Sequence, residues 1–228
     1  MFSQWFGYEA KRKHLLAKAP LGPLKDYLSV PFPDPKTALN ETPILALDFE
    51  TTGLNVKQDQ ILSVGHISID SFEISLATAY HQVICTEGDL KEEGVIIHQI
   101  TDDNKSHGLL AEEVIEKLLQ AMAGKVVLVH FAHIEKNFLQ YACKKLYGMA
   151  PVFPIIDTLV LARKRLDQRT ALYSPNDLRL FNLRESYHLP RYKAHNALSD
   201  ALATAELFLA EIELKHEKEY PQLRTVLI

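Results

Sequence analysis

The chain has 228 residues, of which 47% are hydrophobic, and a formal net charge of −4 at pH 7. This length suits one domain with an appendage or at most two small domains, and the composition allows a full core without disulfides. The acidic balance argues against a general nucleic-acid coat, although an enzyme can still grip a few phosphates through bound metal and local basic residues.

Cysteine usage and the absence of targeting signals bear on the compartment. Cys85 and Cys143 lie far apart and lack the spacing of a zinc site, which favours a reducing environment. No apolar run approaches the roughly 18–20 residues that a bilayer span needs. The N-terminus lacks the apolar segment and small-residue cleavage site of a signal peptide. We therefore expect a cytoplasmic protein without a membrane partner.

Residues 1–43 differ in composition from the rest of the chain. Six of the eleven prolines fall there, so no continuous helix or strand is expected beyond Ala19. Before that point, apolar residues share one helical face: Trp5, Tyr8, Leu15, Leu16 and Ala19. We interpret this segment as a helix docked on the main domain, with a membrane-surface or partner-binding helix as the alternative. The main domain is expected at 44–215 and a tail at 216–228.

The main domain starts with an apolar strand from Ile44 that ends in acidic residues and a Thr-Thr-Gly turn. Apolar runs at 61–69 and 72–85 follow after short loops, which predicts an antiparallel meander. The remaining segments alternate between helical and strand patterns: a helix near 110–119, a strand at 126–130, a helix through 138–146, a strand at 154–157 and helices at 158–166, 178–188 and from about 196.

Three antiparallel strands followed by an α-β-α-β-α series predict a mixed α/β sheet with helices on both faces, the ribonuclease-H-like arrangement. Asp157, at the end of the last short strand, is placed to cap the helix from Thr158. A small apolar segment at 95–101 lies between the meander and the first long helix, and by composition it belongs to the core.

Two carboxylates stand at the end of the first strand. Asp48 and Glu50 are two positions apart, so they point to the same face, while Phe49 turns into the opposite layer. Two neighbouring anions repel each other and lose solvation, and they persist most readily where a cation neutralises them. Taken alone, they are equally compatible with two solvated acids at a strand end.

Two further clusters supply acids and a histidine. Glu135 falls where a strand passes into a helix, and it could aim at the same edge of the sheet, although an acid in a first helical turn is often only dipole compensation. Asn196 is a good helix N-cap, which leaves His195 on the preceding loop and Asp200 about one turn inside the helix. The apolar neighbours of Asp200 predict that it is buried, and a buried acid needs a partner.

Four carboxylates and one histidine suit a hard divalent cation. Oxygen ligands favour magnesium or manganese, whereas zinc would recruit more histidine or cysteine. Two such ions roughly 4 Å apart can clamp the attacking and leaving oxygens of a phosphodiester. Histidine, with an ordinary pKa near ~6.5, can take a proton from water at neutral pH, which gives His195 that role. No nucleophile elbow or P-loop is present.

The motifs DFETTGL, HxAxxExxFL and HxALxDA, in this order, resemble the three motifs of DEDDh-type 3′–5′ exonucleases. The group around the proofreading epsilon subunit of bacterial DNA polymerase III is the most similar, and the resemblance covers about residues 43–212. It implies a ribonuclease-H-like fold and two-metal hydrolysis, with Mg²⁺ or Mn²⁺, that releases nucleoside 5′-monophosphates from a 3′ end.

The resemblance also implies roles for individual residues. Asp48 would bridge both metals, Glu50 and Asp200 would complete the nucleophile-binding site, and His195 matches the general base. Glu135 stands where the family normally has Asp, which predicts reduced or manganese-favoured activity.

Five further positions match those that hold the terminal nucleotide in the family, two of them through the backbone: Thr51, Thr52, Leu54, His98 and Ile134. We expect a DNA substrate with single-stranded or frayed ends, and a DNA polymerase or repair protein as a possible partner. An RNA-trimming exonuclease of the same fold and a non-catalytic scaffold that binds nucleic acid or a polymerase are the alternatives.

Overall fold

The computed structural model describes residues 2–86, 108–168, 172–213 and 220–228. Within these residues, five strands form one sheet of order β3-β2-β1-β4-β5. Their bounds are Ile44–Thr51 for β1, Ile61–Asp70 for β2, Glu73–Val83 for β3, Val126–Val129 for β4 and Ile155–Asp157 for β5. β1, β2 and β3 pair antiparallel, and β4 and β5 run parallel to β1. The predicted mixed sheet and its strand directions are confirmed.

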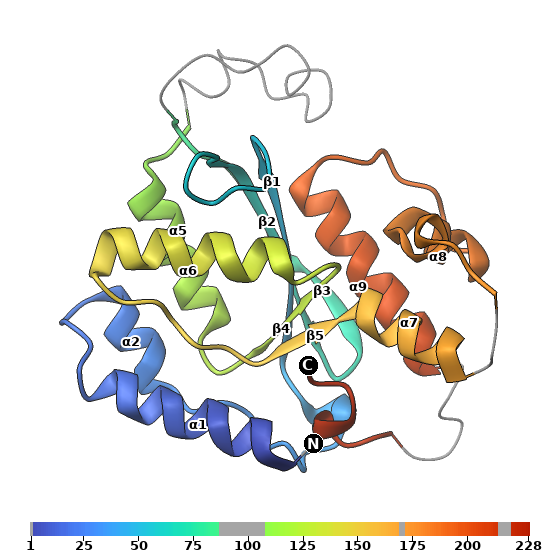
Figure 1. The fold of residues 1–228 in the computed structure, drawn as a ribbon, viewed down its shortest axis with the longest axis horizontal. Helices are drawn as coiled ribbons and strands as arrows, with labels where there is room; N and C mark the ends of the chain where they lie inside the picture. The colour runs from blue at the N-terminus through green and yellow to red at the C-terminus, as the bar shows by residue number, and fades with distance from the viewer. Residues whose placement is uncertain (1, 87–107, 169–171, 214–219) are drawn as a thin grey trace.

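Helices cover both faces of the sheet (Figure 1). They are α1 (Phe2–Leu16), α2 (Pro23–Ser29), α5 (Ala111–Met122), α6 (His133–Tyr147), α7 (Thr158–Gln168), α8 (Leu180–Ser186) and α9 (Ala197–Glu213). α5 and α6 lie on one side with α1 and α2 below them, and α9 lies on the other side with α7 and α8 outside it. The predicted helix at 178–188 is shorter than expected, because 175–178 forms a separate 3-10 turn.

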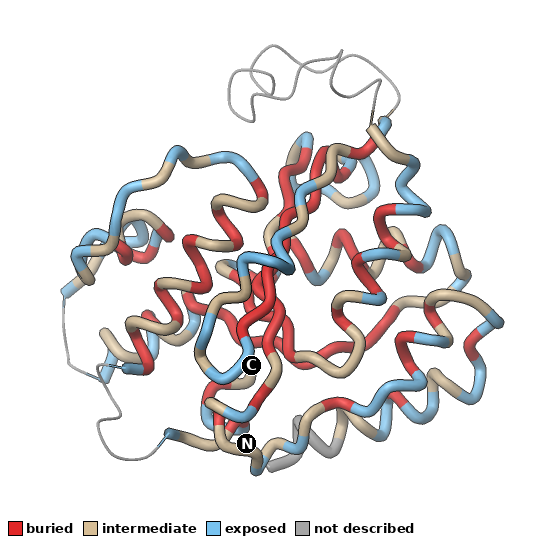
Figure 2. Tube along the Cα trace, turned by 180° about the vertical axis from the view of Figure 1, so that it is seen from behind, coloured by how far each residue is buried: buried red, intermediate tan, exposed pale blue. Residues whose placement is uncertain are grey.

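β1 divides the core into two layers. Leu45, Leu47 and Phe49 pack into the cluster that α5 and α6 contribute to, whereas Ile44 and Ala46 pack with residues of α9. This alternation follows from the two-residue period of a strand, and Figure 2 shows the central strands as the most continuously buried part of the chain. Asp48 and Glu50 are on the same face of β1 as Ile44 and Ala46, so they lie on the side of the sheet that α9 covers.

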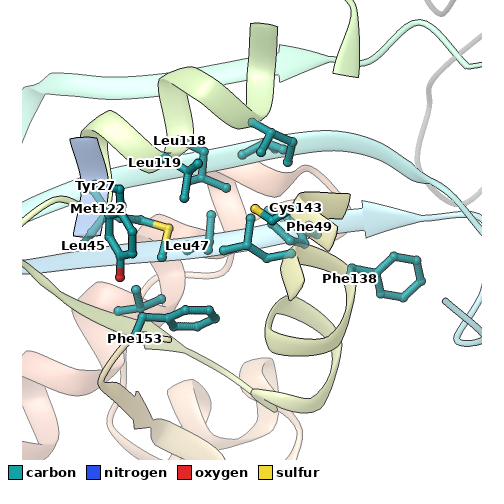
Figure 3. Close-up of a cluster of buried hydrophobic side chains, with 14 of the residues drawn as sticks. Tyr27, Leu45, Leu47, Phe49, Leu118, Leu119, Met122, Phe138, Cys143 and Phe153 are labelled. Carbon is teal, nitrogen blue, oxygen red and sulfur yellow. The ribbon is translucent and has the colours of Figure 1, made fainter. Parts of the chain in front are cut away.

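The N-terminal extension packs on the main domain through α2, a part of it for which no helix was expected. Leu24, Tyr27 and Leu28 of α2 are buried in the same cluster as α5, and the Tyr27 hydroxyl donates a hydrogen bond to the Val152 carbonyl over 3.0 Å (Figure 3). Pro23 occupies the first turn of α2, where a missing N–H is harmless, so this proline starts a helix instead of preventing one.

The described part of the C-terminal tail, 220–228, joins the extension. The N–H of Leu39 donates to the carbonyl of Pro221 over 2.9 Å, and the N–H of Leu223 donates to Thr37 over 3.0 Å. Ile228 continues the contact by donating to Ile155 of β5 over 3.1 Å. The C-terminal end therefore lies beside β5, and α1 reaches it as well, since the Tyr8 hydroxyl donates to the carbonyl of Ile228 over 3.3 Å. No helix among the described residues is long and apolar enough to span a membrane.

The packing of α2 generates a prediction about stability. Leu28 is 0% exposed, so Leu28→Ala should lower the free energy of unfolding by about 2–5 kcal/mol. Leu21 is 89% exposed, and Leu21→Ala should change it by less than about 0.5 kcal/mol. Urea titrations of the whole chain measure both values. A Leu28→Ala protein with unchanged stability, or with a separate early transition of the extension, would show that 1–43 is not part of the cooperative unit.

Candidate active site

Asp48 and Glu50 lie at the carboxyl end of β1, opposite Gly65 and Ser63 of β2. Asp48 is half-buried and Glu50 is 4% exposed. A register shift between Glu50 and Thr51 ends the regular pairing directly after the second carboxylate. Such irregularities re-aim side chains at the end of a strand. Both carboxylates therefore leave the sheet toward α9.

Gly65 lets α9 approach the sheet at this point. A Cβ atom on Gly65 would lie 2.1 Å from the backbone carbon of Ala197 and from the backbone nitrogen of Leu198. Any larger residue would push away the start of α9, because both neighbours are backbone atoms. Asn196 caps this helix, as predicted: its side-chain oxygen accepts the N–H of Ser199 over 3.1 Å.

The close approach of α9 brings three side chains together. One ligand atom each of Glu50, His195 and Asp200 lies within 4.8 Å of the other two. Asp200 is 9% exposed and accepts the backbone N–H of His195 over 3.1 Å. His195 has a positive φ of 67°, which is uncommon for a residue other than glycine and recurs at functional sites. The carboxylate of Asp200 thus fixes the backbone that presents the imidazole.

Glu135 reaches the site from α6 on the other side of β1. Its side chain is 3% exposed, and its charge acts on Asp48. The turn before it is held by Asp157, whose carboxylate accepts the N–H of Phe131 over 3.1 Å and that of Ala132 over 2.9 Å. The predicted cap of α7 is also present, since Asp157 accepts the N–H of Leu159 over 2.9 Å. Its second role joins segments about 25 residues apart, which no local pattern signals.

The acids strongly disfavour each other's charge. Burial and then the charges of Glu135, Asp200 and Glu50 raise the pKa of Asp48 well above its ordinary value. Burial raises the pKa of Glu135 to about 8, with Asp157 and Glu50 adding to the effect. It also raises the pKa of Asp200 to about 7, with Glu50 adding to the effect. The common cause is negative charge gathered where water cannot solvate it.

These residues fit a divalent cation. Oε2 of Glu135 and Oδ1 of Asp200 are buried and accept no hydrogen bond from the described residues. A buried carboxylate oxygen without a donor is costly, and a cation removes that cost. Glu50 offers a further carboxylate oxygen within 4.8 Å of that of Asp200, and the charges of Glu135, Asp200 and Glu50 act on the nearby Asp48. The donor set of carboxylate oxygens with one imidazole suits Mg²⁺ or Mn²⁺.

Arg184 of α8 supports the loop that carries His195, which the sequence analysis missed. Its guanidinium is 1% exposed and donates to the carbonyls of Ala203 over 2.6 Å and Pro190 over 2.8 Å. It also pairs with Glu206 over 2.8 Å, and Glu206 accepts the Tyr192 hydroxyl over 2.7 Å. The loop from 190 to 192 is therefore fastened to α9. The positive charge of Arg184 also offsets a small part of the rise in the pKa of Asp200, which remains raised to about 7 mainly by burial.

Four of the five residues expected to hold a nucleotide are described, and they follow Glu50 or precede Glu135 in the chain. Thr51 is 9% exposed and donates to the Gly53 carbonyl over 2.8 Å, and Thr52 accepts the N–H of Gln60 over 3.0 Å. Leu54 is 68% exposed in the turn beyond them, and Ile134 is half-buried on α6. His98, with the whole 95–101 segment, lies outside the described residues.

Comparison with known proteins agrees with this geometry. The sequence profile of the exonuclease family matches residues 45–208, and the chain belongs to this family. The DNA polymerase III PolC-type protein of Thermotoga petrophila is 32% identical over 170 residues, covering 75% of this chain and 12% of that protein. The DNA polymerase III subunit epsilon of Treponema pallidum is 25% identical over 167 residues, covering 73% of this chain and 75% of that protein.

Among solved structures, the nuclease domain of 3′hExo, a DEDDh family member bound to rAMP, superimposes with a TM-score of 0.65. It is 16% identical, and the match covers 82% of this chain and 98% of that domain. This likeness confirms the ribonuclease-H-like fold. The family match and the epsilon-subunit relative confirm the resemblance to exonucleases of the epsilon group. The chain spans only about an eighth of the PolC-type relative.

The raised carboxyl pKa values predict how pH and metal act together. A carboxyl group whose pKa is higher in the folded chain than in the unfolded chain contributes its full stabilisation below the unfolded-state pKa near 4. This contribution is lost as the pH rises through the folded-state pKa, about 7 for Asp200 and about 8 for Glu135. Without metal, the wild-type melting temperature should therefore decrease relative to that of Asp48→Asn between pH 5 and 8. Added Mn²⁺ should raise the wild-type melting temperature most at pH 8.

Thermal unfolding in EDTA and in MnCl₂ at several pH values measures both effects. A difference of about 1 kcal/mol corresponds to roughly 2–4 °C for a chain of this size. Comparing the two proteins cancels the titration of groups elsewhere, such as His66 and His130, whose pKa values burial lowers to about 4. Equal melting temperatures at every pH, or equal stabilisation of Asp48→Asn by Mn²⁺, would contradict a metal site at these residues.

Proposed function

We propose that the chain is a metal-dependent 3′–5′ exonuclease that hydrolyses DNA at single-stranded or frayed 3′ ends. The observation that carries this proposal is the cluster of Glu50, His195 and Asp200 within 4.8 Å. It lies beside Asp48, inside the segment that matches the exonuclease family. The products are nucleoside 5′-monophosphates and a strand shortened by one nucleotide.

Four carboxylates hold the metal in this proposal. Asp48, Glu50 and Asp200 would hold the metal at which the attacking water is activated, and Glu135 would take part in holding a second ion. When bound, two Mg²⁺ or Mn²⁺ ions supply positive charge that lowers the pKa of water and stabilises charge on the phosphate and the leaving oxygen. The raised pKa values of Asp48, Glu135 and Asp200 support this assignment, because a bound cation relieves the repulsion that causes them.

His195 is the proposed general base. Its imidazole is exposed, so it can exchange protons with solvent, while Asp200 holds its backbone in place. It takes one proton as the water oxygen bonds to the terminal phosphorus, and the bond from phosphorus to the 3′ oxygen breaks. The 3′ oxygen is then protonated, leaving a new 3′ hydroxyl end. Arg184 and Glu206 support this step indirectly by fastening the loop that ends at His195.

The terminal nucleotide is proposed to lie against the turn after β1. The backbone of Thr51 and Thr52 faces the sugar and base, and exposed Leu54 contacts the base. Ile134 and His98 complete the pocket in this assignment. Since the relatives include replicative polymerase proteins, we also propose a DNA polymerase as a partner.

RNA is the second candidate substrate. One observation favours it: the structurally similar 3′hExo domain is bound to rAMP. The two substrates differ at the 2′ hydroxyl, which the turn after β1 would have to read. Matched DNA and RNA oligomers of one sequence separate these readings, because the preferred polymer is degraded faster under identical conditions.

The first test of the proposed function is direct. Purified protein is mixed with 5′-labelled single-stranded DNA in Mg²⁺, Mn²⁺ or EDTA. We expect a ladder that shortens from the 3′ end and that EDTA abolishes. Asp48→Ala should reduce the rate by about 10³-fold, since it removes a carboxylate that would hold the metal. No degradation of DNA or RNA in either metal would reject the exonuclease and leave the non-catalytic scaffold.

A second test concerns Glu135, which stands where Asp is usual in the family. Its side chain is one methylene longer, so its oxygens reach the second ion from a different rotamer. We expect Glu135→Asp to raise the rate in Mg²⁺ by about tenfold, or 1.4 kcal/mol, and to change the rate in Mn²⁺ less. Single-turnover rates in each metal measure this, with Glu135→Gln as the charge-removing control. An unchanged or lower Mg²⁺ rate for Glu135→Asp would mean that the glutamate is already well placed.

A further inference from the structure

An open groove of about 870 Å³ lies between α1, α6 and the chain that leads into β5. Its lining residues come from three parts of the fold, and those that matter here are Lys11 and His14 of α1, Lys136 and Gln140 of α6, and Val152 and Phe153 before β5. Figure 1 shows α1 below α6, with the segment before β5 passing between them. Without the N-terminal extension, this groove would lack one wall.

The groove gathers positive charge in a chain whose overall balance is negative. Lys11, His14 and Lys136 line it, and none of its lining residues is acidic. Lys11 and His14 are three positions apart, so they share one face of α1. Lys136 and Gln140 line the groove from α6. They are four positions apart, so they lie on the same face of that helix. Val152 and Phe153 provide an apolar floor.

One end of the groove begins beside the candidate active site. Lys136 directly follows Glu135 in the first turn of α6, and a helix rises only about 1.5 Å per residue. Glu135 points inward to the acids of β1, whereas Lys136 is exposed toward the groove. Lys136 therefore brings the α6 wall of the groove to within one helical turn of the carboxylate cluster, on a neighbouring face of the same helix.

We propose that this groove binds the single-stranded nucleic acid upstream of its 3′ end, with Lys11 and Lys136 contacting phosphates. The proposal rests on the proposed function and extends it to residues 7–15, outside the segment that matches the exonuclease family. A cationic groove with apolar surface for the bases is the usual form of a single-strand track. The extension would then let the protein contact more nucleotides of the strand than the catalytic cluster alone can contact.

Binding in EDTA tests the track without cleavage, so a failure of the exonuclease assay would not affect the result. Fluorescence anisotropy is measured with oligothymidylates of about 3 and about 20 nucleotides, since single binding folds cover roughly 4–16 nucleotides. Lys11→Gln should weaken binding of the long oligomer about threefold to tenfold. It should also make the dependence of log K on log salt shallower by about 0.7, the value for one lost phosphate contact on a single strand.

Lys13→Gln is the matched control. Lys13 lies on the same helix, its side chain is 70% exposed, and it does not line the groove. It should bind both oligomers as wild type does, and equal melting temperatures would show that both variants are folded. Wild-type binding that is no tighter for the long oligomer, wild-type behaviour of Lys11→Gln, or equal losses in both variants would overturn the proposal. Wild-type behaviour of Lys11→Gln is the result expected if the groove binds an acidic protein segment instead.

Discussion

The structure of the site depends on the repulsion among carboxylates that the fold forces together. Asp48 and Glu50 come from one strand, Asp200 from a helix on one face, and Glu135 from a helix on the other. Each would be better solvated elsewhere, and the raised pKa values of Asp48, Glu135 and Asp200 reflect that cost. The packing of the surrounding apolar core must therefore offset the cost of keeping these carboxylates together when no cation is bound.

Much of the support is polar and lies one layer behind these acids. Asp157 closes the turn before Glu135, and Arg184 with Glu206 fastens the loop before His195. None of these three residues is among the acids and the histidine proposed to contact metal and water. They replace flexible loop backbone by fixed hydrogen bonds, which is how a scaffold keeps catalytic groups in place without using those groups themselves.

The fold class and the acidic residues of the site could be predicted from the sequence, because the patterns that indicate them are local. The alternation of β1, the apolar run of β4 and the Asn196 cap each depend on neighbouring residues, and all three were predicted. The contacts of Asp157 with the turn at 131–132 and of Arg184 with Ala203 join residues 19 to 26 positions apart, so no local periodicity predicts them. The helix α2 was missed for another reason, since Pro23 was read as a breaker when it starts a helix.

Gly65 shows how far such a site extends beyond its chemical groups. It carries no side chain and can hold neither metal nor water, yet its missing Cβ sets the separation between β2 and the first turn of α9. That separation in turn sets where Asp200 and His195 stand relative to Asp48. Gly65 therefore acts by allowing two backbone segments to come into contact. Tolerance to substitution along β2 is therefore governed by steric clearance to a neighbouring backbone, and a ranking of residues by their chemical reactivity would overlook it.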